Sequence, residues 1–259
     1  MSSVVKRFGL AGMPVSQSKS PALFHAAYHG KYKYELFPAT MAAEAMRLFH
    51  AHGLLGMNVT MPLKEQVLPF MASLSEDAAL LQAVNTVVLQ QDALRGYNTD
   101  VQGVAGALAE AGVTVGGRRC VVLGAGGAGR AAACALAHAG ATLAIANRTT
   151  NRAEAAAQLF RATALSLTDA LQHSDGFDVI INTLPAAADV AAHLHLKSQQ
   201  AVLDADYANK PLQALCRNAG ATYIDGSRWL LHQAIPAYRL FTGEEPDVKK
   251  MLNLEIFES

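Results

Sequence analysis

A glycine-rich turn set between an apolar strand and a helix constrains the fold of this chain more than any other feature. The turn is Gly124-Ala125-Gly126-Gly127-Ala128-Gly129, directly after the apolar run Arg119–Leu123. Residues 127–139 predict a helix stopped by Gly140, and residues 142–146 predict a second strand. Strand, helix and strand in this order form a βαβ unit, whose two strands run parallel in one sheet.

Strand and helix patterns alternate along the rest of the chain, which favours α/β layers over separate all-α and all-β pieces. We expect further strands near residues 5–11, 32–37, 57–60, 86–89, 93–97, 179–181, 202–204 and 222–224, and helices near 21–29, 41–52, 101–111, 228–241 and 246–256. The sequence pattern changes near residue 113, and the last helices are expected to return to the first domain. We therefore predict an α/β fold with two domains, 1–103 plus 226–259 and, inserted between them, 104–225.

The composition excludes several classes of function. Lys plus Arg and Asp plus Glu number 21 each, so no basic field attracts nucleic acid or an anionic membrane. The three cysteines lie far apart without the spacing of a metal site, so we expect no metal. Residues 1–7 lack the apolar segment of a secretory signal, and Arg130, His138 and several glycines interrupt the most apolar stretch, 120–146. We expect a cytoplasmic protein that does not enter a membrane.

The glycine turn is typical of a dinucleotide site. The first glycine permits the tight turn, the second lets the backbone approach a pyrophosphate, and the amides of the following helix attract its charge. A sheet that binds NAD usually carries an acidic residue at the end of the next strand, where this chain has Asn147-Arg148-Thr149 with Arg152 close behind. Because a guanidinium suits a 2′-phosphate, NADP is the predicted cofactor. The alternatives are an ordinary glycine turn and an exposed arginine at a strand end.

Two runs that end in charged residues indicate proton transfer. Gly56 to Lys64 and Tyr97 to Asp100 each read as a strand or loop turning into a helix start, with Pro62 suited to a first helical turn. An ammonium and a carboxylate brought together in a cleft position a proton donor against a carbonyl, and a dinucleotide supplies hydride. The prediction is a carbonyl reductase. The alternative for Lys64 is a solvated lysine in a first helical turn.

A third run contains two hydroxyls near a predicted helix start. Ser18 and Ser20, just before Pro21, are placed to bind a carboxylate. Ser20 before a proline is equally well explained as a plain N-cap, so the spacing alone leaves both interpretations open.

Taken together, these motifs resemble the shikimate dehydrogenase family, in order and over nearly the whole chain. The family's serine-x-serine-proline loop matches residues 18–21, and its Asn-Val-Thr-x-Pro-x-Lys run matches residues 58–64. The matches continue as Ala-Val-Asn-Thr at 83–86, Asn-Thr-Asp-x-x-Gly at 98–103, Gly-Ala-Gly-Gly-Ala at 124–128, Asn-Arg-Thr at 147–149 and Gln-Ala at 233–234.

The resemblance implies a substrate domain built from both chain ends, a Rossmann-like NADP domain between them, and reversible reduction of 3-dehydroshikimate to shikimate. It implies that Lys64 exchanges the proton and that Asp100 orients the lysine and a substrate hydroxyl. It further implies that Ser18, Ser20 and Tyr207 bind the substrate carboxylate. The ring hydroxyls are then bound by Thr60, Asn85, Asp100 and Gln233. Beyond the glycine turn and the 147–152 segment, the residues aligned near the cofactor are Glu76, Ala205 and Gly226.

The chain departs from the family pattern on the cofactor side and near the C-terminus. Ala205 stands where a methionine often packs on the nicotinamide, Pro185 lies in an altered run, and Pro236 is expected to kink its helix or open its first turns. Trp229 and His232 are unusual near Gln233. Two alternatives follow, a quinate/shikimate dehydrogenase that prefers NAD and a family-like sensor that binds NADP and a small acid without catalysis. The oligomeric state is expected to be a monomer or homodimer.

Overall fold

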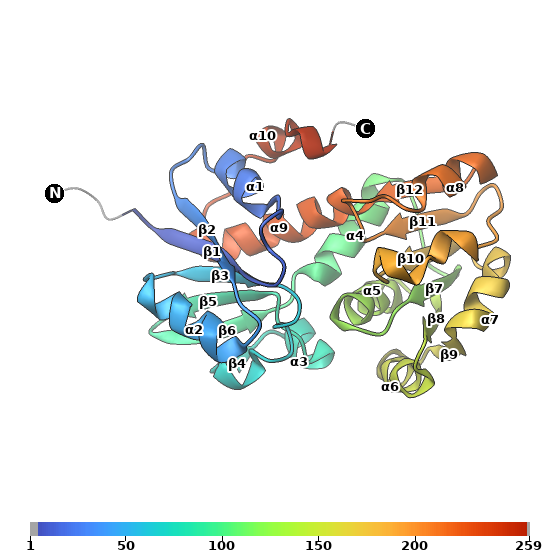
Figure 1. Ribbon diagram of the computed structural model, residues 1–259, viewed down its shortest axis with the longest axis horizontal. Helices are drawn as coiled ribbons and strands as arrows, with labels where there is room; N and C mark the ends of the chain where they lie inside the picture. Colours follow the sequence, from blue (N-terminus) through green and yellow to red (C-terminus); the bar gives the residue numbers. More distant parts are fainter. Residues whose placement is uncertain (1–4, 258–259) are drawn as a thin grey trace. The chain divides into compact units, whose positions relative to one another are not determined.

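The computed structural model describes residues 5–257, and its chain separates into two compact units (Figure 1). One unit is Met1–Thr99 with Gln233–Ser259, and the other is Asp100–His232. The units therefore divide at 99/100 and 232/233, whereas the sequence led us to expect 103/104 and 225/226. Residues 1–4, part of the stretch that argued against a secretory signal, lie outside the described residues.

The described part of the first unit contains a six-stranded mixed sheet of order β2-β1-β3-β5-β6-β4. Strand β1 pairs in parallel with β2 and β3, and β5 turns the sheet antiparallel against β3 and β6. The expected hairpin is present as β5 and β6. The strands are β1 (Arg7–Gly12), β2 (Lys33–Pro38), β3 (Gly56–Val59), β4 (Ser73–Leu74), β5 (Thr86–Gln90) and β6 (Ala93–Tyr97).

Helix α2 (Ala42–Ala51) covers one face of this sheet because its buried residues recur at helical spacing, as Ala42, Ala45, Met46 and Phe49. They share a core with Met57 of β3 and other buried sheet residues. The same unit contains an aromatic cluster. In it, Phe8 of β1 packs against Phe24 of α1 (Ser20–Ala27) and Phe241 of α9 (Gly226–Thr242), with ring centroids 5.2 and 5.4 Å apart. Helices α3 (Glu76–Leu81) and α10 (Val248–Leu252) complete the regular helices of the unit's described residues.

The predicted helix at Pro62 is wrong. Residues 61–67 form successive turns, followed by the short 3-10 helix Leu68–Phe70. Thr60 N–H bonds to the Ala11 carbonyl, and the Lys64 carbonyl accepts from Val84 N–H, at 2.9 and 2.8 Å. These bonds tie the segment to neighbouring strands, so tertiary contacts replace the backbone bonds that a regular helix would have made.

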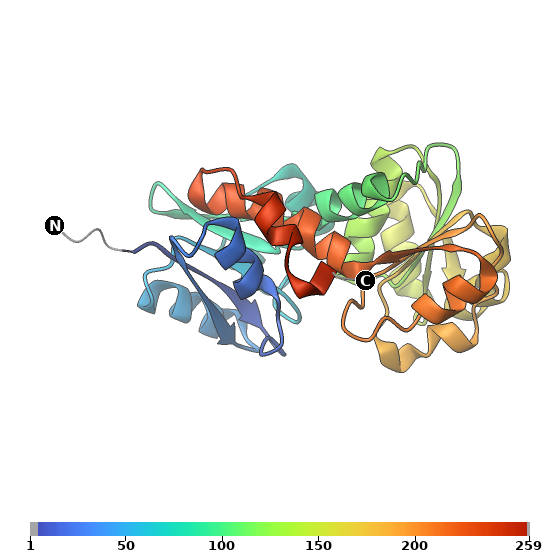
Figure 2. The same cartoon turned by 90° about the horizontal axis from the view of Figure 1, so that it is seen from above.

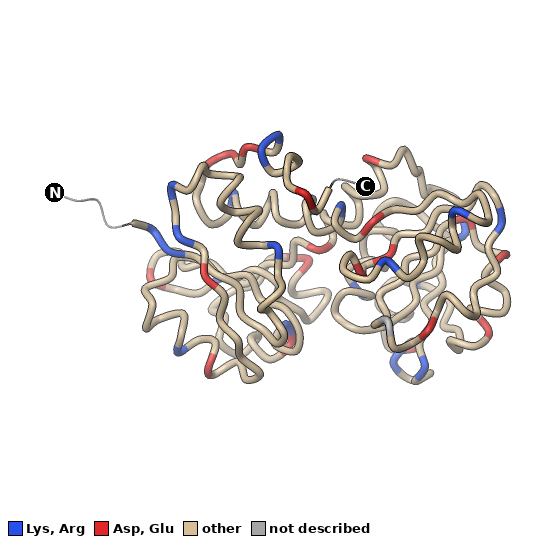
Figure 3. Tube along the Cα trace, turned by 45° about the horizontal axis from the view of Figure 1, so that its top comes forward, with Lys and Arg blue, Asp and Glu red and all other residues tan. Residues whose placement is uncertain are grey.

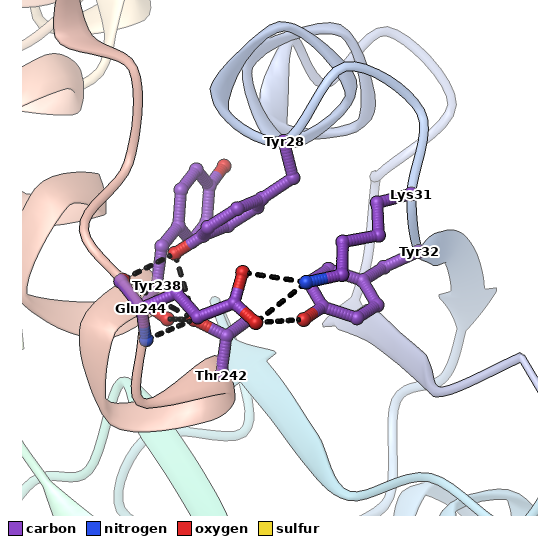
Figure 4. A network of polar contacts seen from close by, with 6 residues as sticks. All are labelled: Tyr28, Lys31, Tyr32, Tyr238, Thr242 and Glu244. Carbon is purple, nitrogen blue, oxygen red and sulfur yellow. Dashed lines mark hydrogen bonds and ion pairs between the residues drawn. The ribbon is translucent and has the colours of Figure 1, made fainter.

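A polar network fastens the end of α9 to the N-terminal half of the first unit (Figure 4). Glu244 accepts two hydrogen bonds from the Lys31 ammonium, at 2.6 and 2.9 Å, and one from the Tyr32 hydroxyl at 2.8 Å. The Tyr28 hydroxyl donates to the Glu244 carbonyl and accepts from Thr242. The network explains how residues more than 200 positions apart build one domain.

The second unit contains a six-stranded, fully parallel sheet of order β12-β11-β10-β7-β8-β9 within the described residues. Helices lie on both of its faces (Figure 2), as a parallel sheet with crossover connections requires. The strands are β7 (Arg119–Leu123), β8 (Thr142–Asn147), β9 (Thr163–Ser166), β10 (Val179–Asn182), β11 (Ala201–Asp204) and β12 (Thr222–Asp225). The helices are α4 (Asp100–Glu110), α5 (Gly127–His138), α6 (Thr150–Phe160), α7 (Leu167–Gln172) and α8 (Gln213–Ala219), together with the first residues of α9.

Pro236 lies inside α9, and the helix continues through it to Thr242. Two unusual residues before Pro236 have structural roles in the second unit. His232 Nε2 lies 3.0 Å from a Glu110 carboxylate oxygen, and a side chain at Gly106 would collide with the His232 ring. Trp229 is buried. The departure at His232 is therefore part of the packing between α4 and the start of α9.

Basic and acidic residues are interspersed along each unit without a segregated field among the described residues (Figure 3). This distribution agrees with the balanced totals of the sequence. Within residues 5–257, no helix combines the length and apolar character needed to cross a bilayer.

The Glu244 network predicts a specific loss of stability in acid. Hydrogen bonds from Lys31 and then Tyr32 lower the pKa of Glu244 from its ordinary value of 4.5. A carboxyl whose pKa is lowered by folding stabilises the protein above its unfolded pKa, and this contribution is lost as pH falls through the folded pKa. Glu244→Gln is expected to lower the melting temperature at pH 7, and the deficit relative to wild type should shrink below pH 4.5.

Thermal unfolding followed by circular dichroism between about pH 7 and pH 3 measures this difference. Glu245→Gln is the matched control, because Glu245 forms an exposed ion pair with Arg239 and a smaller change is expected. A Glu244→Gln deficit that is constant over the whole pH range would contradict the account.

Candidate functional site

The Ser18–Ser20 loop leads directly into α1. Lys19 occupies the N-cap position and no side chain caps the helix, so the interpretation of Ser20 as a plain N-cap is wrong. The Ser18 hydroxyl instead accepts from Ser20 N–H and lies 3.2 Å from the Ser20 hydroxyl. The Tyr238 hydroxyl holds the Ser20 carbonyl at 3.1 Å. The two serine hydroxyls are therefore adjacent and their backbone is anchored.

The Asn85 side chain joins three segments of the first unit. Its Oδ1 accepts from Thr99 N–H at 2.8 Å and from the Thr86 hydroxyl at 2.9 Å. Its Nδ2 faces Thr99 Oγ1 at 3.1 Å and Gln233 Oε1 at 3.5 Å. Asn85 is only 3% exposed. The structure thus brings together Asn85 and Gln233, both predicted from the sequence, and adds Thr99 between them.

Lys64 lies in the first unit, and Asp100 is the first residue of the second. The Lys64 carbonyl bonds to Val84, the residue before Asn85. Asp100 begins α4 and is the residue after Thr99, whose N–H bonds to Asn85. Lys64 is partly exposed, whereas Asp100 is buried. Thr60, also predicted, is half-buried and directly follows β3.

Sequence reasoning assigned no role to Asn58, Thr86, Thr99 or Tyr34. Asn58 and Thr86 are buried polar residues on the paired strands β3 and β5, where they are 3.1 Å apart through Asn58 Nδ2 and Thr86 Oγ1. A buried polar side chain must find partners, so an asparagine inside the short apolar run 56–59 was a usable signal. Tyr34 carried no comparable signal, because tyrosine is common in strands.

In the second unit, the glycine turn lies where β7 meets α5, as the sequence predicts. Gly124 has φ of +112°, and a side chain at Gly129 would overlap the Gly124 carbonyl, so both positions require glycine. A Cβ at Gly126 would meet no atom within 4 Å, and no side chain caps α5. The N-terminal amides of α5 are therefore uncapped by any side chain, and an anion can approach them at Gly126. Ala125, Gly127 and Ala128 complete the turn.

The carboxyl ends of the parallel strands bring other predicted residues to the same edge of the sheet. The main chain at Thr183 bonds to Leu123, and Ala205 N–H bonds to the Asn182 carbonyl. A Cβ at Gly226 would approach the Ala205 carbonyl to 2.7 Å. Ala205 and Gly226 therefore lie together, on the strand ends where ligands of such sheets bind.

One buried carboxyl organises part of this edge. Asp204 is fully buried, and its Oδ1 accepts from Asn182 Nδ2 at 3.1 Å and from Asp206 N–H at 3.3 Å. Burial raises the pKa of Asp204, and the bond from Asn182 opposes that rise. Asp206 in turn accepts from the N–H groups of residues 208 and 209, which shapes the loop that carries Tyr207. Burial also raises the pKa of Tyr207.

The predicted 2′-phosphate residues follow β8. Asn147 Nδ2 donates to the Thr149 carbonyl at 3.1 Å, while Arg148, Thr149 and Arg152 are exposed around the start of α6. Both guanidinium groups are therefore available after a strand that pairs with β7, the strand leading into the glycine turn. Glu76 is exposed in the first turn of α3, in the other unit.

Two family models match the chain. Residues 10–87 match a shikimate dehydrogenase substrate binding domain, and residues 107–208 match a shikimate / quinate 5-dehydrogenase domain. A shikimate dehydrogenase (NADP(+)) of Halobacterium salinarum is 41% identical over 94% of this chain and 96% of the relative. A shikimate dehydrogenase (NADP(+)) of Pyrococcus abyssi is 35% identical, over 97% and 98%.

Solved structures give the same likeness across both units. Shikimate 5-dehydrogenase of Thermus thermophilus, in complex with NADP(H) and shikimate, aligns with a TM-score of 0.86, 32% identity and coverage of 98% of this chain and 99% of that one. Quinate dehydrogenase of Corynebacterium glutamicum, in complex with NAD, aligns with a TM-score of 0.83, 30% identity and the same coverage.

Proposed function

The chain belongs to the shikimate dehydrogenase family, and from that premise we propose how its own residues carry out the reaction. The enzyme is an NADP-dependent oxidoreductase that interconverts 3-dehydroshikimate and shikimate, a step of the shikimate pathway to chorismate and aromatic amino acids. The observation that carries the proposal is the cluster of buried Asn85 and Thr99 with half-buried Gln233, because this set of amides and hydroxyls suits a polyhydroxylated ring.

We assign the substrate carboxylate to Ser18 and Ser20, with Tyr207 as a third partner. The adjacent serine hydroxyls support this assignment, since two short donors on an anchored loop match the two oxygens of a carboxylate. The ring hydroxyls are assigned to Thr60, Asn85, Asp100 and Gln233. Of these, the Asn85 and Gln233 amides already face each other within one unit.

The cofactor is NADP, and the residues of the second unit fit it. The open approach at Gly126 suits the pyrophosphate, and the exposed guanidinium groups of Arg148 and Arg152 suit the 2′-phosphate, with Asn147 and Thr149 beside them. Ala205 and Gly226 are assigned to the nicotinamide side, and Glu76 is kept as a further proposed contact. When bound, NADPH supplies the hydride that reduces the substrate carbonyl.

Proton transfer to and from the substrate oxygen is assigned to Lys64. In reduction, the lysine ammonium donates a proton to the carbonyl oxygen as the ring carbon accepts hydride, and it takes the proton back in oxidation. Asp100 orients the ammonium and a neighbouring substrate hydroxyl. The anchored backbone at Lys64 and at Thr99, the residue before Asp100, supports these roles, because proton transfer requires donor and acceptor to be held at hydrogen-bonding distance.

The compartment and the oligomeric state remain predictions. A reducing cytoplasm is supported by the three free cysteines, which are all buried. Burial raises the pKa of Cys120 to about 12 and that of Cys216 to about 11, so these thiols resist oxidation. A monomer and a homodimer are both consistent with the fold of one chain.

The likeness to a quinate dehydrogenase with NAD makes that activity the specific rival. Initial rates with shikimate or quinate, each against NADP+ or NAD+, separate the two. We expect the highest rate with shikimate and NADP+, because Arg148 takes the place of the acidic residue that holds an NAD ribose. A preference for quinate with NAD+ would support the rival. Binding of both ligands without nicotinamide reduction would instead indicate a sensor.

Replacement of Lys64 tests the chemical step. Lys64→Ala should lower the turnover number for shikimate oxidation by at least about 100-fold, because the proton then has no positioned acceptor. The dissociation constant for NADP+, measured by fluorescence titration, should change little. Lys249→Ala, at an exposed position of α10, is the control for removing a lysine charge. Near-normal turnover in Lys64→Ala would remove this residue from the mechanism.

A further inference from the structure

We propose that Tyr34 is a positioning residue for substrate recognition, because its hydroxyl starts a chain of hydrogen bonds that holds the Asn85 and Gln233 amides in the orientation the backbone imposes. The inference rests on the proposed function, which assigns those two amides to the substrate ring. Tyr34 lies on β2, at the edge of the sheet and away from the segment that carries Asn85, and no motif of the sequence pointed to it.

The first side-chain amide in this series of hydrogen bonds, that of Asn58, is held by a main-chain carbonyl. Asn58 Nδ2 donates to the Asn85 carbonyl at 3.4 Å and to Thr86 Oγ1 at 3.1 Å. A carbonyl accepts hydrogen bonds and never donates them, so the nitrogen of Asn58 must be on this side. Its Oδ1 then faces Tyr34, whose hydroxyl donates to it at 2.7 Å. Tyr34 therefore supplies the proton that the oxygen end of Asn58 needs there.

The second amide is held by a main-chain N–H. Thr99 N–H donates to Asn85 Oδ1 at 2.8 Å, and an N–H cannot accept, so the oxygen of Asn85 must point this way. Thr86 joins the two amides, because its hydroxyl accepts from Asn58 and donates to Asn85 Oδ1 at 2.9 Å. The bonds therefore run in one direction, from Tyr34 through Asn58 and Thr86 to Asn85.

The series of hydrogen bonds that begins at Tyr34 extends to the proposed substrate residues. With its oxygen occupied, Asn85 turns Nδ2 toward Gln233 Oε1, and the Thr99 hydroxyl lies 3.3 Å from the same oxygen. The nitrogen end of the Gln233 amide is consequently the end turned away from Asn85. We infer that the nitrogen end of the Gln233 amide, rather than its oxygen, is turned toward the substrate hydroxyls.

The ring of Tyr34 is fixed, so its hydroxyl has a defined position. Phe24 packs against it at 4.8 Å between centroids, and Tyr238 lies at 6.2 Å. Burial raises the pKa of the Tyr34 phenol well above its ordinary value, with the Ser20 side chain opposing the rise, so the hydroxyl keeps its proton at neutral pH. Tyr34 thus lies between Ser20, assigned to the carboxylate, and Asn58, which leads to the ring residues.

The test removes only the hydroxyl. Tyr34→Phe keeps the packed ring but leaves Asn58 Oδ1 without its donor, and Asn58 cannot turn over without losing its bond to the Asn85 carbonyl. We expect KM for shikimate to rise about tenfold, the change expected for one lost hydrogen bond, while kcat and KM for NADP+ change less than about twofold. Tyr32→Phe is the matched control, since it removes a tyrosine hydroxyl of the same aromatic cluster that bonds to Glu244 instead.

A double-mutant cycle separates this route from one through Ser20. Thr86→Val preserves the shape of the side chain and interrupts the chain between Asn58 and Asn85. If Tyr34 acts through the chain, adding Tyr34→Phe to Thr86→Val raises KM for shikimate no further. If Tyr34 acts through Ser20, the two effects multiply, which would overturn the proposal.

The outcomes are distinguishable from failure of the proposed function. A wild-type enzyme that does not reduce NADP+ with shikimate overturns the function and this inference with it. An active wild type whose Tyr34→Phe variant keeps the wild-type KM overturns the inference alone. Thermal unfolding is recorded for each variant. Should Tyr34→Phe not fold, Thr86→Val provides the same test. An unchanged KM for shikimate in that variant would overturn the proposed series of hydrogen bonds.

Discussion

The side-chain amide of Asn85 is the interaction on which the substrate half of this protein depends. It joins the start of β5 to Thr99, the last residue before the chain enters the second unit, and to Gln233, the first after it returns. Because its partners include a main-chain N–H, its orientation is imposed by the backbone. The fold of the first unit and the chemistry proposed for it therefore share one buried contact.

The cofactor half depends on a steric constraint of a different kind. In a parallel sheet the strand ends meet at one edge, and the chain at β7 must turn tightly enough for α5 to pack against it. Gly124 and Gly129 meet that requirement, since larger residues would strain the turn or overlap its carbonyl. The same closeness leaves the amides at the start of α5 directed at an approaching anion.

Local signals account for what could be predicted from the sequence. The glycine turn, the 86–97 hairpin and the strand 119–123 rest on neighbouring residues, and their positions agree with the structure. The helix at Pro62 was wrong because bonds to distant strands decided that segment. Helix α3 was overlooked although Ser75 caps it by accepting from Ala78 N–H. Tyr34 and Asn58 are 24 residues apart, and no local pattern reveals a contact of that kind.

Calorimetric titration of an Asn85→Asp variant with shikimate tests the central claim most directly. The carboxylate keeps the acceptor for Thr99 N–H, but it places an oxygen where Nδ2 faced Gln233, so the Gln233 amide is driven to turn its oxygen toward the ligand. The account predicts that the dissociation constant for shikimate rises at least about tenfold while that for NADP+ is unchanged. Wild-type affinity for shikimate in this variant would contradict it.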